Sequence, residues 1–132
     1  MRLKHFRLDI GAQIFLACSD RSRLRVLHLI LQNGEMCITD LERILDFTQS
    51  KTSRHILYLK NSGILNTRKI NQWSFYQIKD EVLDLIRQII QFVSKDPELL
   101  KDQDTYKTME SNRELAGLRL KSLYPTQRAK EL

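Results

Sequence analysis

The chain has 132 residues, of which 42% are hydrophobic and 29% charged, a composition typical of a folded globular domain and not of a disordered one. No apolar run reaches the roughly 18–20 residues that span a bilayer, so the sequence predicts neither a membrane protein nor a secretory signal peptide. The net charge of +6 lies in residues 1–78, which carry twelve Lys or Arg against six Asp or Glu, whereas residues 79–132 carry ten of each. We therefore expect the front of the chain to meet a polyanion and the back to serve assembly.

The cysteines and glycines of the chain argue against a disulfide-stabilised protein and against an enzyme with a phosphate-binding loop. The two cysteines, Cys18 and Cys37, form no Cys-x-x-Cys pair, and a chain of this length builds a core without disulfides. We therefore expect a reducing, cytoplasmic compartment. The sequence shows no Gly-rich phosphate loop and no recognisable catalytic acid pair, so it predicts no enzyme and no cofactor.

Helical spacing of apolar residues starts near Ile10 and predicts a first short helix. Either Asp20 or Ser22 is a suitable N-cap for a second helix. That helix should end at Asn33-Gly34, because glycine readily adopts the left-handed conformation that ends helices.

Two further helices are predicted before residue 62. Residues 39–42, Thr-Asp-Leu-Glu, read as a capping box, with Thr39 as the N-cap of a third helix that runs through Leu45. Thr48 should cap a fourth helix, from Gln49 to about Asn61. We expect its apolar residues to face inward: Ile56, Leu57 and Leu59.

The second half of the chain is predicted to hold one β-hairpin and more helix. Residues 64–68 and 73–78 have strand-like composition and flank a turn at residues 70–72, where Asn71 tolerates a positive φ. Helical spacing then returns over residues 81–93. Asp96-Pro97 should start another helical segment, because proline is favoured at the first helical position, and a weaker pattern continues to Leu120.

Asp and Glu are absent from one long stretch of the sequence. Residues 47–79 contain no Asp or Glu, although sixteen acids spread evenly would place about four there. The same window contains six basic residues: Lys51, Arg54, Lys60, Arg68, Lys69 and Lys79. Because a carboxylate repels phosphate, an acid-free basic stretch of this length indicates contact with nucleic acid.

The predicted order of helices followed by a hairpin is that of a winged helix-turn-helix, in which the second helix of the motif enters the major groove of DNA. Here that helix begins with residues 49–55, Gln-Ser-Lys-Thr-Ser-Arg-His, which are all polar. A solvated helix start is the simpler interpretation of such a run. These side chains are also the ones that hydrogen-bond base edges and phosphates.

Four motifs in register resemble those of the ArsR/SmtB family of bacterial metal- and stress-responsive repressors. Residues 19–27 resemble its opening "SDxxRLxIL" signature, and residues 35–41 its "ELCVCDL" box. Residues 49–59 follow its "QSxxSxHLxxL" recognition helix, and residues 61–65 with 73–76 are similar to its exit and wing. The resemblance spans about residues 15–93.

The resemblance implies which residues face DNA. Gln49, Ser50, Ser53 and His55 would line the DNA-facing side of the recognition helix, with phosphate contacts from Lys51 and Arg54. His55 also has a structural interpretation, as most lone histidines do. The full predicted set on the helix and the wing is Gln49, Ser50, Lys51, Thr52, Ser53, Arg54, His55, Arg68, Lys69, Asn71 and Gln72.

The effector is not predicted by the sequence. Family members that sense soft metals use a Cys-x-Cys pair, but here Thr39 stands two residues after Cys37, and one thiolate does not make such a site. Cys18 and Cys37 could form a thiol sensor for metalloid or redox state, or they could be two unrelated buried residues. The family's zinc-type site needs histidine on the dimer helix, which here has Asp84 and no histidine, so no metal site is predicted.

The sequence and the resemblance together predict the following protein. The fold is mainly α with a small β-hairpin (α+β), a winged helix-turn-helix with N- and C-terminal dimerisation helices in residues 1–95. Residues 96–132 would form a helical extension that packs on the dimer, shapes an effector pocket or is partly disordered. The function would be a homodimeric repressor that binds a palindromic operator in double-stranded DNA; the alternative is a winged-helix protein–protein adaptor.

Overall fold

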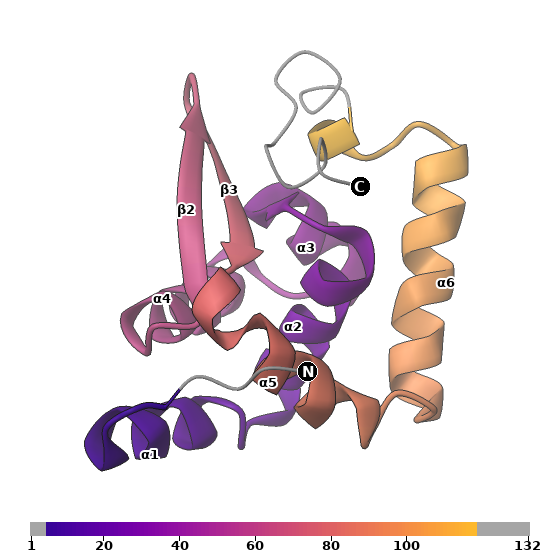
Figure 1. Ribbon diagram of the computed structural model, residues 1–132. Coiled ribbons are helices and arrows are strands. Elements are labelled where there is room, and N and C mark those ends of the chain that lie inside the picture. The colour runs from indigo at the N-terminus through magenta and orange to yellow at the C-terminus, as the bar shows by residue number, and fades with distance from the viewer. Residues whose placement is uncertain (1–4, 119–132) are drawn as a thin grey trace.

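The computed structural model describes residues 5–118, and it places six helices and three strands in them (Figure 1). The helical pattern that was predicted to continue to Leu120 lies partly outside these residues. So do the first residues of the predicted domain 1–95 and the last residues of the predicted segment 96–132. In chain order the elements are α1 (Leu8–Ala17), α2 (Arg21–Asn33), β1 (Met36–Cys37), α3 (Ile38–Leu45), α4 (Gln49–Asn61), β2 (Leu65–Ile70), β3 (Trp73–Ile78), α5 (Asp80–Gln91) and α6 (Pro97–Ser111).

Helix ends follow the capping chemistry of the sequence at most positions. The carboxylate of Asp20 accepts a hydrogen bond from the backbone N–H of Arg23, so Asp20 and not Ser22 is the N-cap of α2. The Thr48 hydroxyl accepts one from the backbone N–H of Lys51, which confirms Thr48 as the N-cap of α4. Asp96 caps α6, with proline in its first turn. Gly34, directly after α2, has a φ of 81°, as predicted for a glycine that ends a helix.

The start of α3 corrects the sequence prediction. Thr39 is not the N-cap: α3 begins at Ile38, and Cys37 occupies the N-cap position without a capping hydrogen bond from its side chain. The reason is a short strand that the sequence did not predict. In β1, Met36 pairs with Tyr76 and Cys37 pairs with Phe75 of β3, so the chain stays extended up to Cys37 and turns helical directly after it.

The sheet is antiparallel and three-stranded, in the order β1-β3-β2. Its two long strands, β2 and β3, form the predicted hairpin, which projects away from the helices (Figure 1). Ile70 pairs with Trp73 across a two-residue connection, and Asn71 in that connection has a φ of 56°, as its residue type predicts. The root of the sheet packs on the helices through buried residues that include Leu65 and Ile78.

The main core lies where α2, α3, α4 and α5 meet the root of the sheet. On α5 the buried residues are spaced four apart, at Val82, Ile86 and Ile90, which places one stripe of that helix against the core. Leu57 of α4 is an exception to the predicted core: it is 56% exposed, because it lies on the opposite face of the helix from Ile56 and Leu59.

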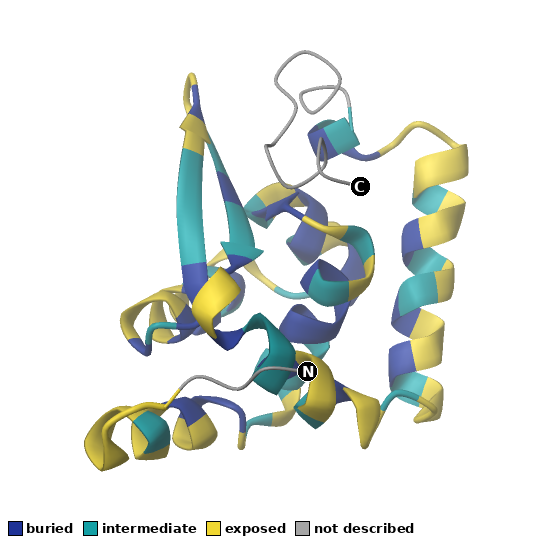
Figure 2. Ribbon diagram, viewed as in Figure 1, coloured by how far each residue is buried: buried dark blue, intermediate teal, exposed yellow. Residues whose placement is uncertain are grey.

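Helix α6 packs lengthwise on the winged-helix core through polar pairs and apolar contacts. The Arg25 guanidinium of α2 donates two hydrogen bonds of 2.9 Å to the buried Asp102 carboxylate. Asn33 and Gln103 exchange two amide hydrogen bonds of 2.8 Å. Figure 2 shows the buried residues of α6 on the side toward the body of the protein.

A short segment after α6, residues 112–118, returns to α3 and the sheet, and we call it the C-terminal latch. The Asp40 carboxylate of α3 accepts hydrogen bonds from the backbone N–H groups of Ala116 (2.9 Å) and Gly117 (2.7 Å). A Cβ atom at position 117 would lie 2.8 Å from Asp40 Oδ2, so the close approach requires glycine there. Ala116 also packs on a small cluster formed by Cys37, Ile70 and Phe75.

The buried His28 of α2 should make stability depend on pH. Burial lowers the pKa of His28 below its ordinary value of 6.5, although the Asp102 carboxylate acts in the opposite direction. In the unfolded chain the pKa returns to about 6.5, so at mildly acidic pH the unfolded state binds more protons. The contribution of neutral His28 to the free energy of unfolding is therefore complete above pH 6.5, and it is lost as the pH falls through the folded-state pKa of His28.

Urea unfolding at about pH 7.5 and 5.5 tests this expectation, with lower stability expected at the acidic pH. His28→Gln should reduce the dependence, leaving the part that comes from other groups such as the buried His55, whereas His5→Gln, an exposed control, should leave it unchanged. A His28→Gln protein with the full wild-type pH slope would contradict this account.

Among residues 5–118, no helix is both long and apolar enough to cross a membrane.

Candidate nucleic-acid interface

Helix α4 has one buried face and one outward face. Thr52, His55, Ile56 and Leu59 are buried against the core. The outward face is a single stripe at helical spacing, which we call the α4 stripe: Gln49, Ser50, Ser53, Arg54 and Leu57. The polar run that is continuous in sequence is therefore divided between two faces by the 3.6-residue period of the helix.

This division corrects the prediction for two residues. Thr52 is fully buried, and its hydroxyl donates a 2.9 Å hydrogen bond to the carbonyl oxygen of Thr48. His55 is 8% exposed and faces Asp20 and Arg23 at the start of α2, and its burial lowers its pKa. Both side chains hold α4 on the core and are turned away from the stripe.

Lys51 and Arg54 differ in their surroundings. The Lys51 ammonium lies 3.9 Å from the centre of the Phe47 ring, a cation–π contact that leaves the lysine half-buried beside the stripe. Arg54 is exposed, and no hydrogen bond or ion pair to it occurs within residues 5–118. Arg54, like Lys60 at the end of α4, is thus exposed and available to an external anion.

The predicted wing residues also separate into two groups. Arg68 of β2 donates two hydrogen bonds, of 2.7 and 3.0 Å, to the buried Glu35 carboxylate, so its charge is neutralised within the fold. Lys69, Asn71 and Gln72 are exposed at the tip of the hairpin. The tip, and not Arg68, is the part of the wing open to a ligand.

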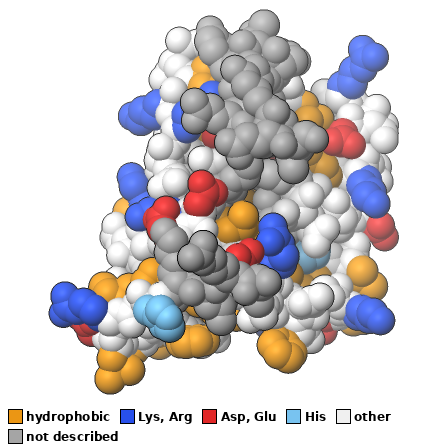
Figure 3. Space-filling model, viewed as in Figure 1, with side chains coloured by type: hydrophobic (Ala, Val, Ile, Leu, Met, Phe, Trp, Pro, Cys, Tyr) orange, Lys and Arg blue, Asp and Glu red, His pale blue; other side chains and the backbone are white. Residues whose placement is uncertain are grey.

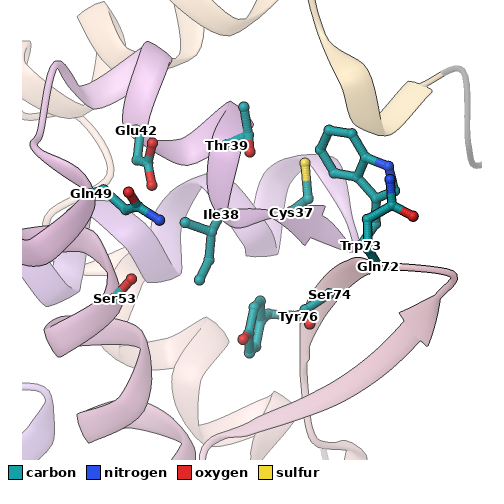
Figure 4. Close-up of a pocket in the computed structure, with 10 residues that line it drawn as sticks. All are labelled: Cys37, Ile38, Thr39, Glu42, Gln49, Ser53, Gln72, Trp73, Ser74 and Tyr76. Carbon is teal, nitrogen blue, oxygen red and sulfur yellow. The ribbon is translucent and has the colours of Figure 1, made fainter.

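An open groove of about 390 Å³ separates α4 from the wing. Figure 4 shows Gln49 and Glu42 near Ile38 at one end of the groove, and Gln72 and Trp73 of the wing at the other end, beyond Cys37. Glu42 belongs to α3 and was not among the residues predicted for the site. The stretch that is free of acids in sequence therefore has acids beside it in space, among them Glu42 in the groove, Glu35 on Arg68 and Asp20 facing His55.

The structure does not bring the two cysteines together. Cys18 belongs to the main core and Cys37 to the small cluster beneath the C-terminal latch. Burial raises the pKa of Cys18 to about 11 and that of Cys37 to about 12, the latter with a further contribution from the Asp40 carboxylate. Both are therefore neutral thiols at physiological pH and poor nucleophiles or metal ligands in this conformation.

The geometry of the stripe and wing agrees with what comparison with known proteins shows. Residues 20–67, which include α2, α3 and α4, match the family described as "Bacterial regulatory protein, arsR family". An uncharacterized HTH-type transcriptional regulator of Methanocaldococcus jannaschii is 38% identical over 89 residues, which are 67% of this chain and 97% of that protein. The chain belongs to the arsR family.

Two further relatives of this arsR-family chain bear on fold and function. The arsenical resistance operon repressor of Escherichia coli (strain K12) is 37% identical over 70 residues, 53% of this chain and 60% of that repressor. A solution structure from Mycobacterium bovis, described as a homodimeric winged helix-turn-helix DNA-binding domain, superposes with a TM-score of 0.60 at 24% identity, covering 67% of this chain and 82% of that one.

These relatives confirm the predicted fold class, a helix-rich winged helix-turn-helix, with β1 as the one added strand. The arsR-family chain is a DNA-binding transcriptional regulator. The family is one of regulators and not of enzymes.

Proposed function

We propose that this arsR-family regulator is a homodimeric repressor that binds a near-palindromic operator through the α4 stripe and the wing tip. The observation that carries the proposal is the stripe itself, four polar side chains and Leu57 on the outward face of a helix whose other face is fixed in the core. A relative named as an operon repressor supports the direction of regulation. We infer a cytoplasmic location, because binding DNA requires access to the chromosome.

Residue types assign roles within this interface. Gln49, Ser50 and Ser53 carry hydrogen-bonding groups that suit base edges. Arg54 and Lys51 flank them and suit phosphates, and Lys69 brings a third cation from the wing. Asn71 and Gln72 at the wing tip extend the contact along the backbone. Thr52, His55 and Arg68 act in this account by holding α4 and the wing in place.

The surface at α1 and α5 supports the homodimer. Helix α1 is held to the fold by Ile14 and Ala17, while its outer side is apolar and exposed, with Leu8 89% exposed. Phe92, just after α5, is 90% exposed. Figure 3 shows hydrophobic side chains gathered along the lower edge of the molecule, where Figure 1 places α1 and α5. Exposed apolar side chains gathered in this way mark an interaction surface, and the structural relative described as a homodimer favours a second copy as the partner.

Salt-dependent DNA binding tests the proposed function. The wild-type protein is titrated, by fluorescence anisotropy, with a duplex from upstream of its own coding region and with an unrelated duplex of equal length. Three cations per protomer give about six phosphate contacts in a dimer, so affinity should fall about 1,000-fold between about 50 and 200 mM salt. The upstream duplex should bind more tightly at every salt concentration. Equal affinity for both duplexes, or no binding, would support the adaptor alternative.

A further inference from the structure

The α4 stripe ends in an exposed leucine that the fold does not use. Leu57 is 56% exposed, and within residues 5–118 it belongs to neither hydrophobic cluster. Its neighbour Tyr58 is also partly exposed, but the Arg23 guanidinium covers that ring at 4.0 Å. Leu57 follows Ser53 by four residues and Arg54 by three, so it lies directly beside them on the outward face.

The length of the stripe matches the groove that it is proposed to enter. With a rise of 1.5 Å per residue, Leu57 lies about 12 Å along the helix from Gln49, the distance spanned by three to four base pairs. The major groove is about 12 Å wide, which is wide enough to admit an α-helix, so the whole stripe can lie within it. When Gln49 and Ser53 lie against base edges, Leu57 therefore faces the base pair at the end of the same run.

The chemistry of leucine restricts what it can recognise there. Its side chain neither donates nor accepts a hydrogen bond, and the apolar group that a base pair presents in the major groove is the 5-methyl group of thymine. Resting on the proposed function, we propose that Leu57 is a specificity determinant that reads a thymine methyl group in each operator half-site. A polar residue at this position would accept any base that satisfies its hydrogen bonds, whereas Leu57 favours one that offers a methyl group.

Methyl deletion in the DNA tests the proposal directly. An operator is first selected from a random duplex pool with the wild-type protein. Each thymine of both half-sites is then replaced in turn by deoxyuridine, which removes only the methyl group, and affinity is measured at constant salt. One symmetric pair of replacements should weaken binding about fourfold per half-site, the scale of burying a single methyl group. The Leu57→Ala protein should bind the thymine and uracil operators equally.

Controls separate this effect from general changes. Leu100→Ala removes an exposed leucine from α6 and should retain the wild-type thymine preference. The inference is overturned if Leu57→Ala keeps that preference, if no replacement affects the wild type, or if Leu57→Ala weakens every duplex equally and shifts the dimer equilibrium. A wild type that binds its operator in a salt-dependent manner without a methyl effect defeats this inference alone. A wild type that selects no operator defeats the proposed function as well.

Discussion

Arg54→Glu is expected to weaken operator binding by at least about 30-fold while leaving the fold intact. The side chain is exposed on the α4 stripe, so reversing its charge removes a phosphate or base contact and places a carboxylate against DNA. Loss of one such contact costs about 1–3 kcal/mol, and a two-fold dimer loses two, so affinity should fall about 30-fold at the least and up to about 20,000-fold. Fluorescence anisotropy with the selected operator measures the change, and circular dichroism verifies the fold.

The matched control is Lys107→Glu, which makes the same change of net charge at an exposed position on α6. Lys107→Glu should change affinity only through weak, long-range electrostatics that salt screens, because α6 and α4 lie on opposite sides of α2 (Figure 1). If Lys107→Glu weakens binding as much as Arg54→Glu does, the interface depends on total charge, and the assignment of the α4 stripe is wrong.

Asp40→Ala is expected to release the C-terminal latch and to expose Cys37. The substitution removes the acceptor of two charge-assisted hydrogen bonds to Ala116 and Gly117. We expect the free energy of unfolding to fall by about 1–3 kcal/mol, measured by urea titration. The Cys37 thiol, at present buried beside Gly117, should then react faster with a thiol reagent, by about tenfold for each 1.4 kcal/mol lost from the closed state. Loss of the Asp40 carboxylate also removes one of the causes that raise the pKa of Cys37, which acts in the same direction.

The thiol assay is made in a Cys18→Ser background so that Cys37 alone reports. Asp104→Ala is the control, since it removes an exposed carboxylate from α6. Equal thiol reactivity in the Asp40→Ala and Asp104→Ala proteins would show that the latch does not cover Cys37 in solution.

Local chemistry made much of the fold predictable from sequence. The N-caps Asp20 and Thr48 and the turn at Asn71 depend on interactions within a few residues, and these predictions are confirmed. Strand β1 depends instead on pairing with residues about forty positions away, and two residues are too few to show alternation. The same pairing moved the start of α3 ahead of Thr39, although the capping pattern at Thr39 was locally sound.

The candidate interface shows the same limit. The sequence located the polar helix and the wing tip, but it could not divide the polar run between the two faces of α4. For that reason Thr52, which was predicted to face DNA, is buried, and Leu57, which was predicted to face the core, is exposed. The neutralisation of Arg68 by Glu35 joins residues 33 positions apart, and an acid-free window in sequence carries no information on such partners.

Hydroxyl-radical footprinting of the operator complex tests the central claim most directly, because it shows both the DNA contact and its symmetry. The wild-type protein should protect two segments related by a two-fold axis, with centres about 10–10.5 base pairs apart or a multiple of that distance. The Arg54→Glu protein at the same concentration should protect neither. A single unsymmetric protected segment, or a wild-type footprint retained by Arg54→Glu, would contradict a homodimer that reads its operator through α4.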